Sequence, residues 1–102
     1  MENRLITVCE GTGMGDELFV METNAPVEKL KELERISCKV YLDGGDFEDV
    51  PNWENVLKDK GYSFEYVNSH GHVTPYGSSK MWLEENYPTI TEHYVIENQP
   101  EL

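Results

Sequence analysis

Three histidines are the residues of this chain whose chemistry is easiest to name. His70 and His72 form an H-x-H pair, and His93 follows in a later apolar segment. Three imidazoles can hold zinc and leave its fourth position open. The pair shares one face only if the backbone is extended, and the surrounding Asn, Ser, Gly and Pro residues indicate a loop. We therefore expect ordinary loop histidines, and the alternative is a metal-binding enzyme or sensor that uses all three.

The segment EGTGMGD, residues 10–16, contains three alternate glycines, and glycine-rich loops can bind phosphate. Its spacing is not the G-x-G-x-x-G fingerprint, and the next segment, ELFVMET, has the composition of a strand rather than a helix. Acids at both ends would also repel phosphate. The pattern predicts a wide hairpin turn in which glycine supplies positive φ. A third interpretation is an exposed contact loop with Met14 at its tip.

No covalent or calcium chemistry is indicated by the remaining residues. Ser69 precedes His70, but the chain has no G-x-S-x-G nucleophile elbow. Cys9 lies in an apolar strand pattern, which is typical of a buried, inert thiol. The run DGGDFED does not match the spacing of a calcium loop. The sequence therefore predicts a protein that is not an enzyme and needs no cofactor.

Charge is the strongest compositional signal. Twenty acidic residues face eight basic ones, which gives a formal charge of −12. Phosphate binding needs clustered Lys and Arg, so direct binding to nucleic acid or to an anionic membrane is disfavoured. Residues 40–57 and 81–102 contain acids and no Lys or Arg. Such stretches could form a face that attracts a basic protein surface, for example the groove of a nucleic-acid-binding enzyme. The alternative is that the acids scatter and only favour solubility.

The predicted contacts with such a partner are acids and exposed tyrosines. The acids are Asp43, Asp46, Glu48, Asp49, Glu84 and Glu85. Tyr76 and Tyr87 are the aromatic candidates, because tyrosine is favoured at interfaces. Trp53 and Trp82 lie on predicted helix stripes, so we expect them in the core.

The elements expected to carry these residues have the order β-β-α-β-α-β-α-β. Strands are predicted at 5–9, 17–23, 39–42, 62–67 and 89–96, and helices at about 26–36, 51–60 and 78–86. The first two strands should form a hairpin, residues 68–77 a loop, and the chain from about residue 97 a loose tail. In the first helix the expected apolar stripe is Val27, Leu30, Leu33 and Ile36. We expect Gly61 to end the second helix with a positive φ.

The fold class predicted from this order is α+β, with one mixed sheet in a single small domain of residues 1–102. No apolar run is close to the length needed to cross a membrane. The apolar part of the first residues is too short for a secretory signal. We therefore expect a cytoplasmic protein with Cys9 and Cys38 as thiols.

In size and charge the chain resembles the anti-CRISPR proteins of phages and mobile elements. The stretches DGGDFEDVPNWE and EENYPTITEHYVIE carry the local part of this resemblance. It implies an inhibitor that blocks the nucleic-acid groove of an RNA-guided nuclease by imitating DNA, and it assigns no residue a role. A further alternative is a structural or regulatory domain that forms homodimers through an exposed sheet edge.

Overall fold

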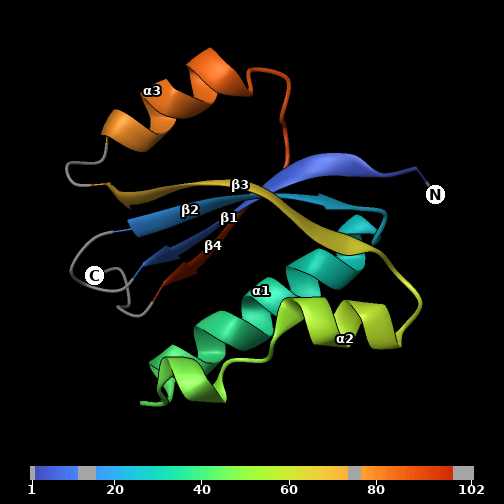
Figure 1. Cartoon of the computed structure of the whole chain (residues 1–102). Coiled ribbons are helices and arrows are strands. Elements are labelled where there is room, and N and C mark those ends of the chain that lie inside the picture. Colours follow the sequence, from blue (N-terminus) through green and yellow to red (C-terminus); the bar gives the residue numbers. More distant parts are fainter. Residues whose placement is uncertain (1, 12–15, 74–76, 98–102) are drawn as a thin grey trace.

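The computed structural model describes residues 2–11, 16–73 and 77–97. In chain order the elements are β1 (Arg4–Gly11), β2 (Asp16–Thr23), α1 (Val27–Leu42), the short 3-10 helix η1 (Phe47–Asp49), α2 (Trp53–Asp59), β3 (Phe64–Val73), α3 (Gly77–Asn86) and β4 (His93–Glu97) (Figure 1). The predicted α+β class, with a mixed sheet and three α-helices in these ranges, is confirmed. Met14, Tyr76 and the expected tail from residue 98 onward lie outside the described residues.

The sheet has the strand order β3-β2-β1-β4. β1 and β2 pair antiparallel from Arg4↔Thr23 to Gly11↔Asp16, which confirms the hairpin. β4 pairs parallel with β1, beginning at Thr7↔His93. β3 pairs antiparallel with β2 and forms the opposite edge. The sheet is therefore mixed because the chain returns to β1 through the crossover that contains α3.

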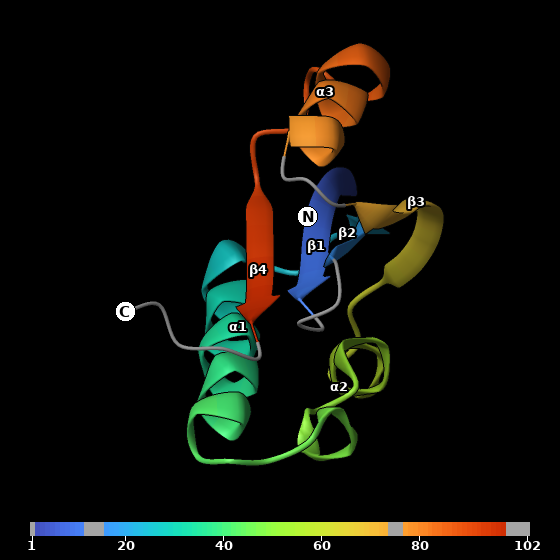
Figure 2. The ribbon, with the colours of Figure 1, turned by 90° about the vertical axis from the view of Figure 1, so that its left-hand side faces the viewer.

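Helices cover both faces of the sheet. α1 and α2 lie on one face, and α3 lies on the other (Figures 1 and 2). Side chains alternate along a strand, so Ile6 and Val8 of β1 point toward α1 and α2 and Thr7 points the other way. Between the sheet and the first two helices lies a buried cluster of apolar side chains: Ile6, Val8, Ala25, Leu30, Leu33, Trp53, Leu57, Phe64, Tyr94 and Ile96.

The strand predicted at residues 39–42 is wrong, because these residues form the last turn of α1. Tyr41 packs against the buried cluster, and this contact outweighs the β-preference of the segment KVYL. The helix ends just beyond, where Gly44 has a φ of 87°. The apolar stripe predicted for the first helix is only partly buried. Val27 and Ile36 are 38% and 40% exposed, because a strict three-residue spacing rotates about 60° per step around a helix.

The loop predicted at 68–77 is also largely wrong, because β3 continues to Val73. Two register shifts against β2 insert extra residues into β3, and such bulges accommodate polar residues in an edge strand. The predicted last strand was too long at its start, since β4 begins only at His93. The second and third helices form as expected, with the Asn52 side chain capping α2 and Gly61 at a φ of 88°.

α1 covers the outer edge of β4. The Val95 backbone N–H donates to a Glu34 carboxylate oxygen at 2.8 Å. The Cys38 thiol donates to the Val95 carbonyl oxygen at 3.3 Å. Both backbone groups of this edge residue are thereby hydrogen-bonded, so they are not available to pair with a further strand. In the described part of the chain, the structure contains no helix with the length and apolar character needed to traverse a bilayer.

Candidate functional site

The predicted acidic contacts divide into two groups on opposite sides of the sheet. Asp43, Asp46, Glu48 and Asp49 lie in the connection between α1 and α2, whereas Glu84 and Glu85 lie on α3. Asp43 pairs with Lys39 at 3.1 Å, and the Asp49 carboxylate accepts the Asp46 backbone N–H at 2.9 Å. The structure therefore does not bring the six acids together, and two of the four loop acids already have partners.

Tyr87 and Trp82 attach α3 and its following turn to the sheet. The Tyr87 hydroxyl accepts a hydrogen bond from the Asn68 side-chain amide at 3.1 Å, and its ring lies 5.4 Å from that of Trp82. Trp82 stacks on His70, with ring centroids 5.0 Å apart. Trp82 is half-buried in this outer layer rather than in the main core, and Tyr87 is engaged within the molecule.

The structure separates the candidate metal ligands. His70 on β3 and His93 on β4 belong to opposite edges of the four-stranded sheet, about 14 Å apart at the usual strand spacing. His93 Nδ1 makes a 2.7 Å hydrogen bond with the Thr7 hydroxyl. His70 Nδ1 is buried and has no hydrogen-bond partner among the residues that the structure describes. His72 lies on β3, and its side chain is outside the described part of the structure. His70 and His93 therefore cannot bind the same metal ion.

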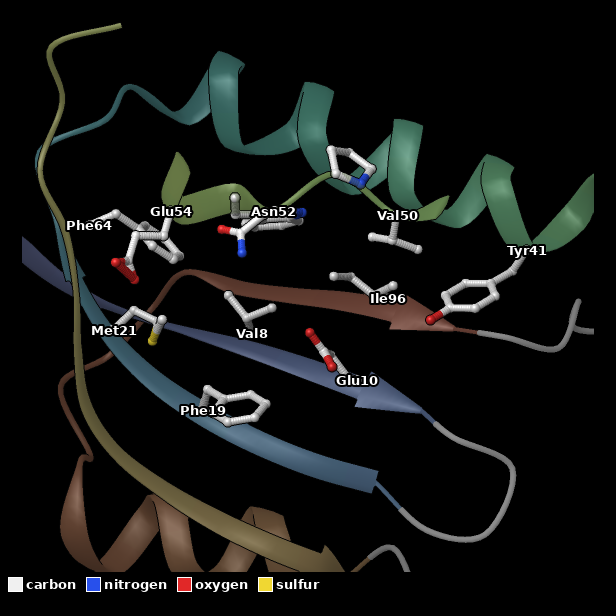
Figure 3. A pocket seen from close by; sticks show the side chains of 12 residues that line it. Val8, Glu10, Phe19, Met21, Tyr41, Val50, Asn52, Glu54, Phe64 and Ile96 are labelled. Atoms are coloured by element: carbon white, nitrogen blue, oxygen red, sulfur yellow. The ribbon is translucent and has the colours of Figure 1, made fainter. Parts of the chain in front are cut away.

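A pocket of about 360 Å³ opens between the sheet and the start of α2 (Figure 3). Its floor is apolar and is lined by Val8, Phe19, Met21, Trp53, Phe64 and Ile96. The polar lining residues are Glu10, Tyr41, Asn52 and Glu54. Figure 3 shows the Glu10 carboxylate and the Tyr41 hydroxyl pointing into the opening. The volume and the apolar lining with few polar groups are typical of small ligand sites.

Strand register assembles this pocket. Val8 opposes Phe19 across the antiparallel pair, and Glu10 opposes Ile96 across the parallel pair. Cross-strand partners share a face, so β1, β2 and β4 contribute neighbouring side chains to the floor, and Phe64 adds one from β3. Tyr41 reaches the pocket from the last turn of α1, the segment that was predicted to be a strand.

Carboxylates lie at the pocket opening and close to it. Partial desolvation raises the pKa of the Glu10 carboxyl group above its ordinary value, and the carboxylate of Glu17, its cross-strand partner, raises it further. The Glu10 side chain as a whole is exposed, so the apolar surroundings affect only part of it. Burial raises the pKa of the Tyr41 phenol, and the carboxylates of Glu10 and Asp46 add to that effect.

The carboxylates near the pocket differ in whether they pair with a cation among the described residues. Glu54 is paired with Lys58 at 3.2 Å. In contrast, within residues 2–11, 16–73 and 77–97 neither Glu10 nor Asp46 forms an ion pair with a lysine or arginine. An uncompensated carboxylate beside an apolar, aromatic cavity favours a ligand that is cationic at one end and apolar along its length.

Sequence reasoning missed Glu10 and Tyr41 as site residues. The sequence pattern indicated Glu10 only as a residue beside the glycine segment. It placed Tyr41 in a predicted strand that belongs to α1 in the structure. One signal was available: Glu10 continues the alternation of Ile6 and Val8, so it places an acid at a position that faces the core. Comparison of the chain with protein-family models, curated proteins and solved structures finds no match.

Proposed function

We propose that the protein is a non-enzymatic binding protein that covers a basic surface on a protein partner. The observation that carries this proposal is the apolar pocket with the Glu10 carboxylate at its opening and Asp46 close to Tyr41 on its rim. Charge of one sign around a concave site accelerates the approach of an oppositely charged partner. The apolar floor then offers burial for an anchoring side chain, which charge on a flat surface would not provide.

The partner class that fits best is a nucleic-acid-binding enzyme. Its groove is basic because it must neutralise phosphates, and an acidic protein lodged there would exclude nucleic acid. We further propose that the partner is an RNA-guided nuclease, in line with the size and the formal charge of −12. We propose the cytoplasm as the compartment, in line with Cys38 being present as a thiol.

The contact surface that we propose is narrower than the sequence suggested. It contains the pocket opening with Glu10, and it extends along the α1–α2 connection through Asp46 and Glu48. Asp49 contributes to the local fold, because it caps the Asp46 backbone N–H. Glu84 and Glu85 lie beyond the sheet on α3, so we propose no contact for them.

A matched pair of charge reversals tests this assignment. The test variant is Asp46→Lys with Glu48→Lys, and the control is Glu84→Lys with Glu85→Lys, which changes the net charge equally. A partner would be isolated from lysate at low salt, identified, and purified. We expect the test variant to associate at least about tenfold more slowly than the wild type and the control to stay close to it.

The readout that completes this test is function of the partner. The purified protein should block nucleic-acid binding or cleavage by the partner, and block it less as salt rises, because salt screens exposed charges. Equal slowing by both double variants would mean that only overall charge matters. An unchanged association rate for both, or a block that is insensitive to salt, would refute electrostatic occlusion.

The homodimer alternative is less well supported by the sheet edges. β4 is covered by α1 through Glu34 and Cys38. β3 is the edge on the other side, where Tyr66 is 58% exposed. Its two register shifts against β2 interrupt the regular ladder that another strand would need. A monomer mass in light scattering at micromolar concentration would exclude this alternative.

A further inference from the structure

We propose that the pocket is the receptor for one arginine side chain of the partner. This inference rests on the proposed function, since the arginine would belong to the basic surface that the protein covers. It names the chemical group that enters the cavity between the sheet and α2. Three features of the site support arginine: the aromatic floor, the carboxylate at its mouth, and the repulsion that a cation would relieve.

The floor of the pocket suits an apolar stem. Trp53 and Phe64 are buried, with ring centroids 6.4 Å apart, and Phe19 lies on the neighbouring strand. The three methylene groups of an arginine can cover such a surface while its charged end stays near water. A guanidinium also stacks favourably on aromatic faces and is less strongly hydrated than an ammonium group.

The mouth of the pocket suits the charged end. The Glu10 carboxylate and the Tyr41 hydroxyl point into the same opening (Figure 3). A carboxylate can accept two parallel N–H bonds from the guanidinium fork, a geometry that lysine cannot offer. The phenolic oxygen can accept another of the five N–H groups.

The local charges would reward a cation. Glu10 from β1 faces Glu17 from β2, and Tyr41 from α1 is close to both Glu10 and Asp46. Glu54 of α2 also lines the pocket and is already paired with Lys58. An arginine between these groups would offset the repulsion between Glu10 and Glu17. This repulsion destabilises the free protein, and arginine binding would relieve it.

Titration with small blocked amino acids tests the proposal without the partner. The probes are N-acetyl-arginine methylamide, the uncharged citrulline analogue of the same shape, and the lysine analogue. Isotope-labelled full-length protein would report binding through the Trp53 indole N–H signal and the Glu10 carboxyl signal. We expect saturable arginine binding, with citrulline and lysine each at least about tenfold weaker.

Two matched variants complete the test. Glu10→Gln should weaken arginine binding at least about tenfold, because the charged acceptor is lost. Glu54→Gln, on the same lining but with Lys58 as its partner, should change it less than about threefold. Equal binding of citrulline, tighter binding of lysine, or no response of the Trp53 and Glu10 signals would each overturn the arginine assignment.

The failure of this inference can be told apart from failure of the proposed function. If the blocked arginine does not bind but the Asp46→Lys, Glu48→Lys variant still associates slowly with the partner, the arginine inference is wrong and the occluding function stands. If arginine binds and neither double charge reversal alters association, the pocket chemistry stands and electrostatic occlusion, the proposed function, is refuted.

Discussion

Arg4 and Glu92 form a two-pronged ion pair although 88 positions separate them in the chain. Arg4 Nε lies 2.8 Å from one Glu92 carboxylate oxygen, and Nη2 lies 2.9 Å from the other. The Tyr94 hydroxyl donates to the same carboxylate at 3.0 Å. The pair joins β1 to the residue just before β4, so it holds the two parallel strands in register.

Glu92→Gln should lower the free energy of unfolding at pH 7 by about 1–2 kcal/mol, because the pair is only partly buried. The Arg4 hydrogen bond holds the pKa of Glu92 below its ordinary value of 4.5. The stabilisation is therefore complete above that value and is lost as pH falls through the lower, folded-state pKa. Urea unfolding should show the wild-type advantage at pH 7 and a smaller one near pH 3, and a constant difference would contradict this assignment.

Ser37→Ala should destabilise the fold by about 1–3 kcal/mol. Ser37 is fully buried, and its hydroxyl accepts the Trp53 indole N–H at 2.9 Å. Alanine would leave that N–H buried without an acceptor. Ser69→Ala is the control, since the Ser69 hydroxyl shares a hydrogen bond with the exposed Tyr66 hydroxyl at 3.2 Å. This substitution should cost less than about 0.5 kcal/mol. Equal losses in thermal unfolding would count against the buried hydrogen bond.

Glu10→Gln should stabilise the free protein at pH 7, by about 0.5 kcal/mol once solvent screening is considered. Partial desolvation and Glu17 raise the pKa of Glu10, so the folded state disfavours its ionised form. This penalty is fully present above the raised pKa and disappears below the ordinary one. Denaturation from pH 3 to pH 7 should therefore show the variant gaining on the wild type as pH rises. A wild type that is the more stable of the two at pH 7 would contradict the prediction.

The substitution Glu10→Gln should raise the stability of the free protein and lower its affinity for arginine. Glu10→Gln removes the repulsion with Glu17 and also removes the proposed acceptor for arginine. A variant that is more stable but binds less tightly would identify Glu10 as a residue whose charge serves recognition at a cost in stability. Losses in both properties would instead indicate a structural role.

Glu34→Ala should expose the edge of β4. The Val95 N–H donates to the Glu34 carboxylate and would then be open to water or to another strand. We expect faster hydrogen exchange at the Val95 amide and more self-association at high protein concentration. Glu32→Ala is a control on the same helix, because Glu32 pairs with Lys29 at 3.6 Å and, within the described residues, forms no hydrogen bond to β4. Identical exchange at Val95 in both variants would exclude the proposed edge protection.

Local sequence patterns were enough for much of the fold. Two β-rich segments on either side of the glycine-rich segment predicted the hairpin of β1 and β2, and Gly61 marked the end of α2 correctly. The errors arose where tertiary contacts override local preference. Packing of Tyr41 against the buried cluster stabilises a β-prone segment as the last turn of α1. Pairing with β2 stabilises residues 68–73 as a strand although most of them are polar.

The candidate pocket could not be predicted in the same way. Glu10 and Ile96 become neighbours only through the parallel pairing of β1 with β4, and Tyr41 joins them only because α1 is longer than expected. Local periodicity carries no information on such long-range register. The acid-rich composition was visible, but the division of its members between the two sides of the sheet was not.

The parallel pairing of β1 with β4 also affects the order in which the protein can fold. Thr7 of β1 pairs with His93 of β4, which lies near the other end of the chain, whereas β1 and β2 are joined by a short connection. Non-local pairs of this kind form slowly, because closing a long loop costs entropy before any contact is gained. We therefore expect the hairpin and its helices to assemble first and β4 to dock last. Since Ile96 of β4 completes the pocket wall, a chain stalled before that step would be largely folded and still unable to bind.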